Sequence, residues 1–245
     1  MPAKPPACFF VYISSRIPSR SALCYTLCGY FLYGEDKVMQ ILFVLEIIGT
    51  IAFAISGAIV GIQKKMDIFG VCILGLTAAV GGGILRDLIL NITPPAAFQN
   101  PAFAATAIVI SILVFIPAVR NVFEHGKKFY EAVILIMDSI GLGLFTVVGV
   151  QVATAAMPER NLFLITFVGV LTGVGGGILR DVFAGNTPYI FIKHFYACAS
   201  IIGAWTCALL WPYTGSVPAM IAGAALTVVL RLLAAIFRWS LPKAK

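Results

Sequence analysis

Charged side chains are scarce in this chain. They make up only 11% of its 245 residues, against about a quarter in a soluble globular protein. This scarcity argues against a water-soluble domain. The net charge of +7 lies mainly in short polar stretches and at the chain ends, where membrane orientation signals are found. Nothing in that distribution indicates a surface for nucleic acid.

Residues that hold metals or perform covalent chemistry are also few. The two histidines, His125 and His194, stand alone in the sequence. The six cysteines form neither a disulfide framework nor a CxxC metal pattern. No nucleophile stands beside a base in any recognisable pattern. The sequence therefore predicts no metal centre, no cofactor and no enzymatic activity.

Apolar residues, by contrast, make up 60% of the chain. They fall into runs of roughly 20, the length at which a helix crosses the hydrocarbon core of a membrane. Connections between the runs are short and carry turn residues such as Pro94, Pro95 and Pro212. We predict an all-α membrane protein with seven transmembrane helices, at residues 40–61, 68–90, 102–119, 130–154, 162–184, 195–211 and 216–237.

Residues 1–38 differ from the rest, with several prolines and arginines around a short mixed stretch. A signal peptide is one interpretation, but no small-residue cleavage site follows a clear apolar core. A soluble extension is another. The interpretation we favour places the true start at Met39 and treats the upstream residues as a disordered or wrongly assigned extension. Gly34 and Glu35 could then be encoded by a purine-rich ribosome-binding sequence.

An internal duplication is the strongest signal in the sequence. The segment GGGILRD at residues 81–87 recurs residue for residue at 175–181. The Thr-Pro pair at 93–94 recurs at 187–188 with the same offset. Upstream, Glu46, Gly49, Phe53 and Gly57 correspond in order to Asp138, Gly141, Phe145 and Gly149.

The duplication predicts how the membrane domain is organised. Residues 39–120 form a first three-helix repeat, residues 121–212 a second, and residues 213–245 a seventh helix with a basic tail. Because three is odd, the second repeat enters the membrane with inverted topology, as in many transporters. Most Lys and Arg residues between spans fall on one side, which predicts a cytosolic C-terminus and an N-terminus outside.

Both copies carry a glycine triplet within a predicted span, and each glycine costs about 1 kcal/mol relative to alanine in a helix interior. One interpretation is a broken helix, whose freed carbonyls line a water-filled path and coordinate a cation. The alternative is close helix packing, since small residues recur there at four-residue spacing. A phosphate-binding loop is disfavoured because the Gly-Lys-Ser/Thr ending is absent. The triplets are Gly81, Gly82 and Gly83, and Gly175, Gly176 and Gly177.

Ionisable residues within membrane spans are rare and usually functional. Their depth along the helices predicts that Glu46 pairs with Arg86, and Asp138 with Arg180. These pairs could also serve only to hold helices together. Neighbours in sequence are expected to point to different faces, which would leave Asp87 and Asp181 to face a cation path.

Two further charges have plainer interpretations. Arg231 lies near the cytosolic end of the last span, where its side chain is expected to extend to the interface. Asp67 stands at a helix start and is expected to cap it.

The doubled GGGILRD segment with its downstream Thr-Pro pair resembles the prokaryotic branch of the trimeric intracellular cation channel family. The same domain has also been named a glycine transporter. The resemblance implies a homotrimer in the lipid of a bacterial inner membrane, with a path for potassium or sodium through each subunit along the second and fifth helices. It also implies that the six glycines form helix kinks and that Arg86, Asp87, Arg180 and Asp181 form the charged motif of the family.

One departure from the family concerns gating. Animal members carry a basic residue in the fourth helix that is tied to voltage response, and lipid-binding basic residues near the kink of the second. The core of the fourth span here offers only Asp138. The sequence therefore argues against voltage gating and phosphoinositide binding.

The expected function is a monovalent cation channel, and the rival is a secondary transporter for glycine or another small amino acid. A helix N-terminus at a break can hold a carboxylate, and an inverted repeat suits alternating access. A purely structural membrane scaffold would leave the duplicated charges unexplained.

Overall fold

The computed structural model describes residues 36–117, 127–157, 161–192, 195–237 and 239. The chain divides into two units, Met1–Asp36 and Lys37–Lys245, and the fold below is that of the second. Residues 1–35, which include most of the predicted extension, lie outside the described residues. The described part of the chain contains helices and no strand, as the sequence predicts.

Seven of the described helices have 15 residues or more. They are α2 (Asp36–Gln63), α3 (Ile68–Ile89), α5 (Pro101–Phe115), α7 (Lys127–Ala156), α8 (Leu162–Phe183), α10 (Tyr196–Thr214) and α11 (Ser216–Ile236). Two four-residue helices, α4 (Ala96–Gln99) and α9 (Tyr189–Ile192), follow α3 and α8.

Five helices of the described chain are long and apolar enough to cross a membrane: α2, α3, α7, α8 and α11. They coincide with the first, second, fourth, fifth and seventh predicted spans, so the chain is a multi-pass membrane protein. The helix α5 is apolar but has only 15 residues. It and the 19-residue α10 occupy the predicted third and sixth spans. The count of seven crossings stays a prediction.

Of two helix ends predicted from the sequence, one is confirmed and the other is wrong. The side chain of Asp67 accepts a hydrogen bond of 2.7 Å from the backbone nitrogen of Gly70, which confirms the predicted cap. The turn predicted at Pro212 is wrong, since α10 continues through this residue to Thr214. The chain instead leaves the helix at Gly215, whose φ of 84° favours glycine.

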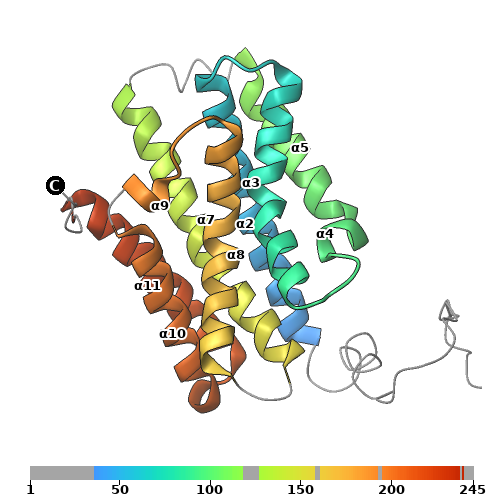
Figure 1. Cartoon of the computed structure of the whole chain (residues 1–245), viewed down its shortest axis with the longest axis vertical. Coiled ribbons are helices and arrows are strands. Elements are labelled where there is room, and N and C mark those ends of the chain that lie inside the picture. The colour runs from blue at the N-terminus through green and yellow to red at the C-terminus, as the bar shows by residue number, and fades with distance from the viewer. Residues whose placement is uncertain (1–35, 118–126, 158–160, 193–194, 238, 240–245) are drawn as a thin grey trace, which may run out of the picture. The chain divides into compact units, whose positions relative to one another are not determined.

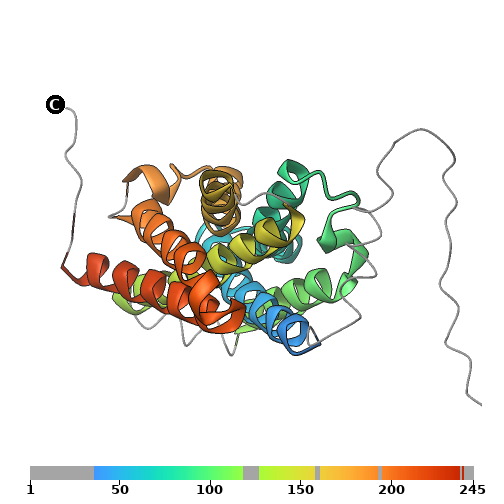
Figure 2. The ribbon, with the colours of Figure 1, turned by 90° about the horizontal axis from the view of Figure 1, so that it is seen from below.

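The helices α3 and α8 pack extensively against each other. Figure 1 shows them running in opposite directions, so that the ends adjoining α4 and α9 lie at opposite ends of the bundle. The helix α5 packs on α3, while α10 and α11 pack on each other and on α7. Seen along the helices, α5 and the α10–α11 pair lie on opposite sides of the unit (Figure 2).

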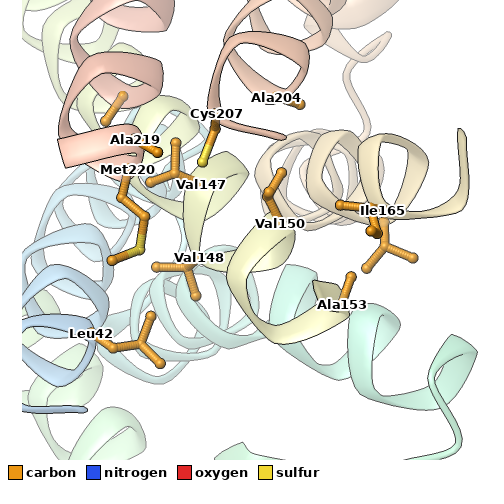
Figure 3. Packing of buried hydrophobic residues seen from close by; sticks show 12 residues of the cluster. Leu42, Val147, Val148, Val150, Ala153, Ile165, Ala204, Cys207, Ala219 and Met220 are labelled. Atoms are coloured by element: carbon orange, nitrogen blue, oxygen red, sulfur yellow. The ribbon is translucent and has the colours of Figure 1, made fainter. Parts of the chain in front are cut away.

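The helix α7 is the most enclosed of the apolar spans. Val147, Val148 and Val150 on α7 belong to a buried cluster with Cys207 of α10 and Met220 of α11 (Figure 3). A helix covered on several sides is held in a fixed rotation by its packing. This rotation matters because the same helix carries Asp138.

Candidate functional site

The glycine triplets lie where α3 and α8 cross. Both helices are α-helical through the triplets, which favours close packing over the broken-helix interpretation. The helix kinks implied by the resemblance stay a prediction. A Cβ at Gly82 would lie 2.2 Å from the carbonyl oxygen of Thr172, and one at Gly176 would lie 2.2 Å from that of Ala78. Only glycine permits this approach, and close packing therefore accounts for the middle position of each triplet.

Other contacts around this crossing are reciprocal in the same way. A Cβ at Gly81 would meet Leu179 at 2.6 Å, and a Cβ at Gly175 would meet Leu85 at 3.0 Å. The two copies are offset by 94 residues, so Gly81 corresponds to Gly175 and Leu85 to Leu179. Exchanging the copies therefore turns one of these contacts into the other.

The same exchange holds between α2 and α7. The rings of Phe53 and Phe145 stack with centroids 5.4 Å apart. A Cβ at Gly49 would lie 2.9 Å from the Phe145 ring, and a Cβ at Gly141 would lie 2.6 Å from the Phe53 ring. These two glycine–phenylalanine contacts also exchange when each residue is replaced by its counterpart in the other copy.

Glu46, Arg86 and Asp87, here called the Glu46 cluster, lie near the end of α3 that adjoins α4. The Nη1 of Arg86 donates to Glu46 Oε1 at 3.3 Å, and its Nε donates to Asp87 Oδ1 at 2.7 Å. The second oxygen of Asp87 accepts a 2.8 Å hydrogen bond from the backbone nitrogen of Ala96, the first residue of α4.

Asp138, Arg180 and Asp181, the Asp138 cluster, form the corresponding group near the end of α8. The Nη1 of Arg180 donates to Asp138 Oδ1 and to Ser56 Oγ, both at 2.6 Å. Its Nε donates to Asp181 Oδ1 at 2.8 Å, and the backbone nitrogen of Tyr189 donates to Asp181 Oδ2 at 2.9 Å. Tyr189 follows the end of α8; burial raises the pKa of its hydroxyl, although nearby Arg180 opposes the shift.

These contacts confirm one prediction and correct another. The cross-helix pairs Glu46–Arg86 and Asp138–Arg180 are present. The expectation that each arginine stands apart from the following aspartate is wrong, because the guanidinium folds back along the helix end and bonds both carboxylates. Asp87 and Asp181 are buried within these networks and do not stand apart from the pairs.

A small pocket opens beside the Glu46 cluster. Its volume is about 30 Å³, enough for a water molecule or a small cation. Its polar lining comes from Glu46, Thr50, Arg86 and Asp87, with Gly83 at its wall. Two carboxylates and one guanidinium leave this lining with a formal charge of −1.

Phe103 and Phe145 supply the aromatic part of the lining. The second of these rings stacks on Phe53, so the pocket ends against the stacked rings between α2 and α7. No group of three or more His, Cys, Asp or Glu side chains among the described residues is arranged to hold a metal ion.

The corresponding space beside the Asp138 cluster contains Tyr196 of α10. A Cβ at Gly177 would lie 2.9 Å from its Oη. The guanidinium of Arg231 lies 4.9 Å from the centre of the Tyr196 ring. Arg231 is only 1% exposed, so the expectation that it extends to the membrane interface is wrong.

Sequence reasoning missed three residues of the site, Ser56, Thr50 and Tyr196. The two hydroxyl residues occupy positions in α2 that look like ordinary small polar residues of a membrane helix. The tyrosine follows a connection between spans, where an interfacial tyrosine is common. None carries a local signal of its contacts, which depend on which face each helix turns inward.

Comparisons with known proteins agree with this architecture. The family model described as "Glycine transporter" matches residues 43–118 and 135–212. The inner membrane protein YadS of Escherichia coli K12, a UPF0126 protein, is 38% identical over 200 residues, covering 80% of this chain and 92% of that protein.

Solved structures of TRIC cation channels are similar as well. One is 35% identical with a TM-score of 0.73, covering 82% of this chain and 96% of its own. The TRIC orthologue of Rhodobacter sphaeroides is 29% identical with a TM-score of 0.74, covering 81% and 99%. This chain belongs to the UPF0126 membrane protein family, which the glycine transporter model describes, and it shares the fold of the TRIC trimeric intracellular cation channels.

Proposed function

We propose that this protein is a monovalent cation channel, passing potassium or sodium along a path through each subunit of a homotrimer. The observation that carries the proposal is the pocket of the Glu46 cluster, which combines a formal charge of −1 with room for a small cation. Carboxylates at a pore entrance attract cations and exclude anions. The similar solved structures are themselves described as cation channels.

The path we propose uses the third glycine of each triplet. Gly83 borders the pocket of the Glu46 cluster, and Gly177 faces Tyr196 and Asp138. The first two glycines of each triplet join α3 to α8 in the closely packed crossing. Arginines 86 and 180 hold the carboxylates in place, so that their charge is available at fixed positions.

An inverted repeat accounts for the exchange of contacts around the crossing. A two-fold axis between the copies would produce such contacts, because it exchanges each residue with its counterpart in the other copy. The opposite directions of α3 and α8 (Figure 1) fit an axis in the membrane plane. In this arrangement the Glu46 cluster faces outside and the Asp138 cluster faces the cytosol, with the C-terminus cytosolic and the N-terminus outside.

The rival function is a carrier for glycine or another small amino acid, and the observation that favours it is the description of the matching family model. Purified protein in liposomes separates the two. A channel passes potassium down its gradient with no amino acid present. A carrier shows saturable glycine uptake that is accelerated by glycine on the opposite side. Absence of potassium flux together with such exchange would reject the channel.

A further inference from the structure

The two charged clusters correspond in sequence but differ in what covers them. At Gly83, a Cβ would find no atom closer than the Arg86 guanidinium, at 3.9 Å. At Gly177, the corresponding position, the hydroxyl of Tyr196 would lie 2.9 Å away. Tyr196 therefore lies against Gly177, whereas Gly83, the counterpart of Gly177, borders the open pocket.

Exposure follows the same asymmetry. The side chain of Glu46 is 17% exposed, whereas that of Asp138 is 3% exposed. Arg180 has no exposed surface at all. The proposed path is therefore open at the Glu46 cluster and covered at the Asp138 cluster in this conformation.

A residue from outside the duplication lies against the Tyr196 ring. Arg231 lies on α11, the helix that follows both repeats, and its guanidinium stacks over the Tyr196 ring. A buried cation–π contact of this kind fixes the ring strongly because neither group is solvated. It also adds a positive charge beside the Asp138 cluster. The formal charges of the two aspartates and two arginines at this end sum to zero. Those of the Glu46 cluster sum to −1.

Tyr196 covers the Asp138 cluster directly. A Cβ at Gly177 would lie 2.9 Å from Tyr196 Oη and 3.7 Å from Asp138 Oδ1, and Tyr196 is itself only 3% exposed. Displacement of its ring would leave the cluster without this cover. The arrangement thus fits a side chain that alternates between a covering and a displaced position.

We infer that Tyr196 is the gate at the Asp138 end of the path and that Arg231 is the positioning residue that holds it shut. The inference rests on the proposed channel function. It assigns a role to α11, which is to close the path at one charged cluster while the other stays open. Opening requires the ring to leave the face of Gly177, and loss of the Arg231 contact favours that movement.

The test compares four variants of the full chain: Tyr196→Ala, Arg231→Met, the double variant, and Tyr213→Ala as control. Tyr213 lies on the same helix and is 86% exposed. Two quantities are measured, potassium flux in liposomes and amide hydrogen exchange of residues 174–181 in α8. If the alanine variant does not purify as a folded protein, Tyr196→Leu replaces it.

Tyr196→Ala should raise both flux and exchange, while Tyr213→Ala should change neither. Arg231→Met should raise flux by roughly tenfold, the population shift expected for loss of a desolvated cation–π contact. It should add nothing further in the Tyr196→Ala background, because it acts through the ring. Equal effects in both backgrounds would show that Arg231 acts by charge alone and would overturn its positioning role.

Unchanged flux and exchange in folded Tyr196→Ala would overturn the gate. Absence of flux in the parent and every variant would reject the channel function. Amide exchange would then still decide whether the Tyr196 ring covers the Asp138 cluster, since increased exchange in Tyr196→Ala but not in Tyr213→Ala shows this cover.

Discussion

Gly82 of α3 and Gly176 of α8 lie against each other's helix so closely that neither position has room for a methyl group. Each hypothetical Cβ would lie 2.2 Å from a carbonyl oxygen of the opposite helix. The contact joins the two copies of the duplicated segment within their seven identical residues. It makes the crossing a structural constraint on any path through the protein.

Replacing Gly176 with alanine should therefore destabilise the protein by about 1–3 kcal/mol or more, because the clash is with backbone and cannot be relieved by a rotamer change. Thermal unfolding in detergent measures the effect. Gly83→Ala is the matched control, since its methyl group would have no neighbour within 3.9 Å. Equal stability of the two variants would contradict the close crossing.

The two arginines should differ in their contribution to stability. Arg180→Ala leaves two carboxylates unpaired in a fully buried network, and loss of one member of a buried pair typically costs about 3–5 kcal/mol. Asp138→Asn in the same chain should recover part of this cost. Arg86→Ala should cost less, because the side chain of Glu46 is 17% exposed, against 3% for that of Asp138. Unfolding free energies of the three variants, with exposed Lys64→Ala as control, test this order.

Ser56 links the two repeats by accepting a hydrogen bond from Arg180. Ser56→Ala should destabilise the protein by about 1.5–3 kcal/mol, the contribution of a hydrogen bond to a charged group. Ser139 provides the comparison, because it is equally buried but bonds only the carbonyl of Leu135 in its own helix. Ser139→Ala should cost well under half as much. A similar loss in both variants would argue against a specific link.

Glu46→Gln should lower potassium flux, because it changes the formal charge of the pocket lining from −1 to zero. A reduction of about tenfold corresponds to about 1.4 kcal/mol, within the roughly 4 kcal/mol between unit charges 4 Å apart at an effective dielectric constant of 20. The flux of Glu46→Asp, which keeps the charge, should stay nearer to that of the parent. Flux that is unchanged in Glu46→Gln would remove the pocket from the path.

Much of the architecture was predictable from the sequence. Long apolar runs gave the positions of the helices because burial in lipid requires them and because backbone hydrogen bonds can be satisfied within each helix. The duplication identified which residues correspond. Depth along each helix was then enough to pair Glu46 with Arg86 and Asp138 with Arg180, since a buried charge must find a partner at its own level.

The tertiary structure decided the contacts that depend on how each helix is rotated and how closely it approaches its neighbours. The sequence left two interpretations of the glycine triplets, and only the crossing of α3 with α8 shows that Gly82 and Gly176 are required for packing. The bonds from Arg86 and Arg180 to the aspartates that follow them also escaped prediction. The same is true of Arg231 over Tyr196. Hydropathy fixes that a helix is in the membrane, but the direction of each side chain follows from packing between helices that are distant in sequence.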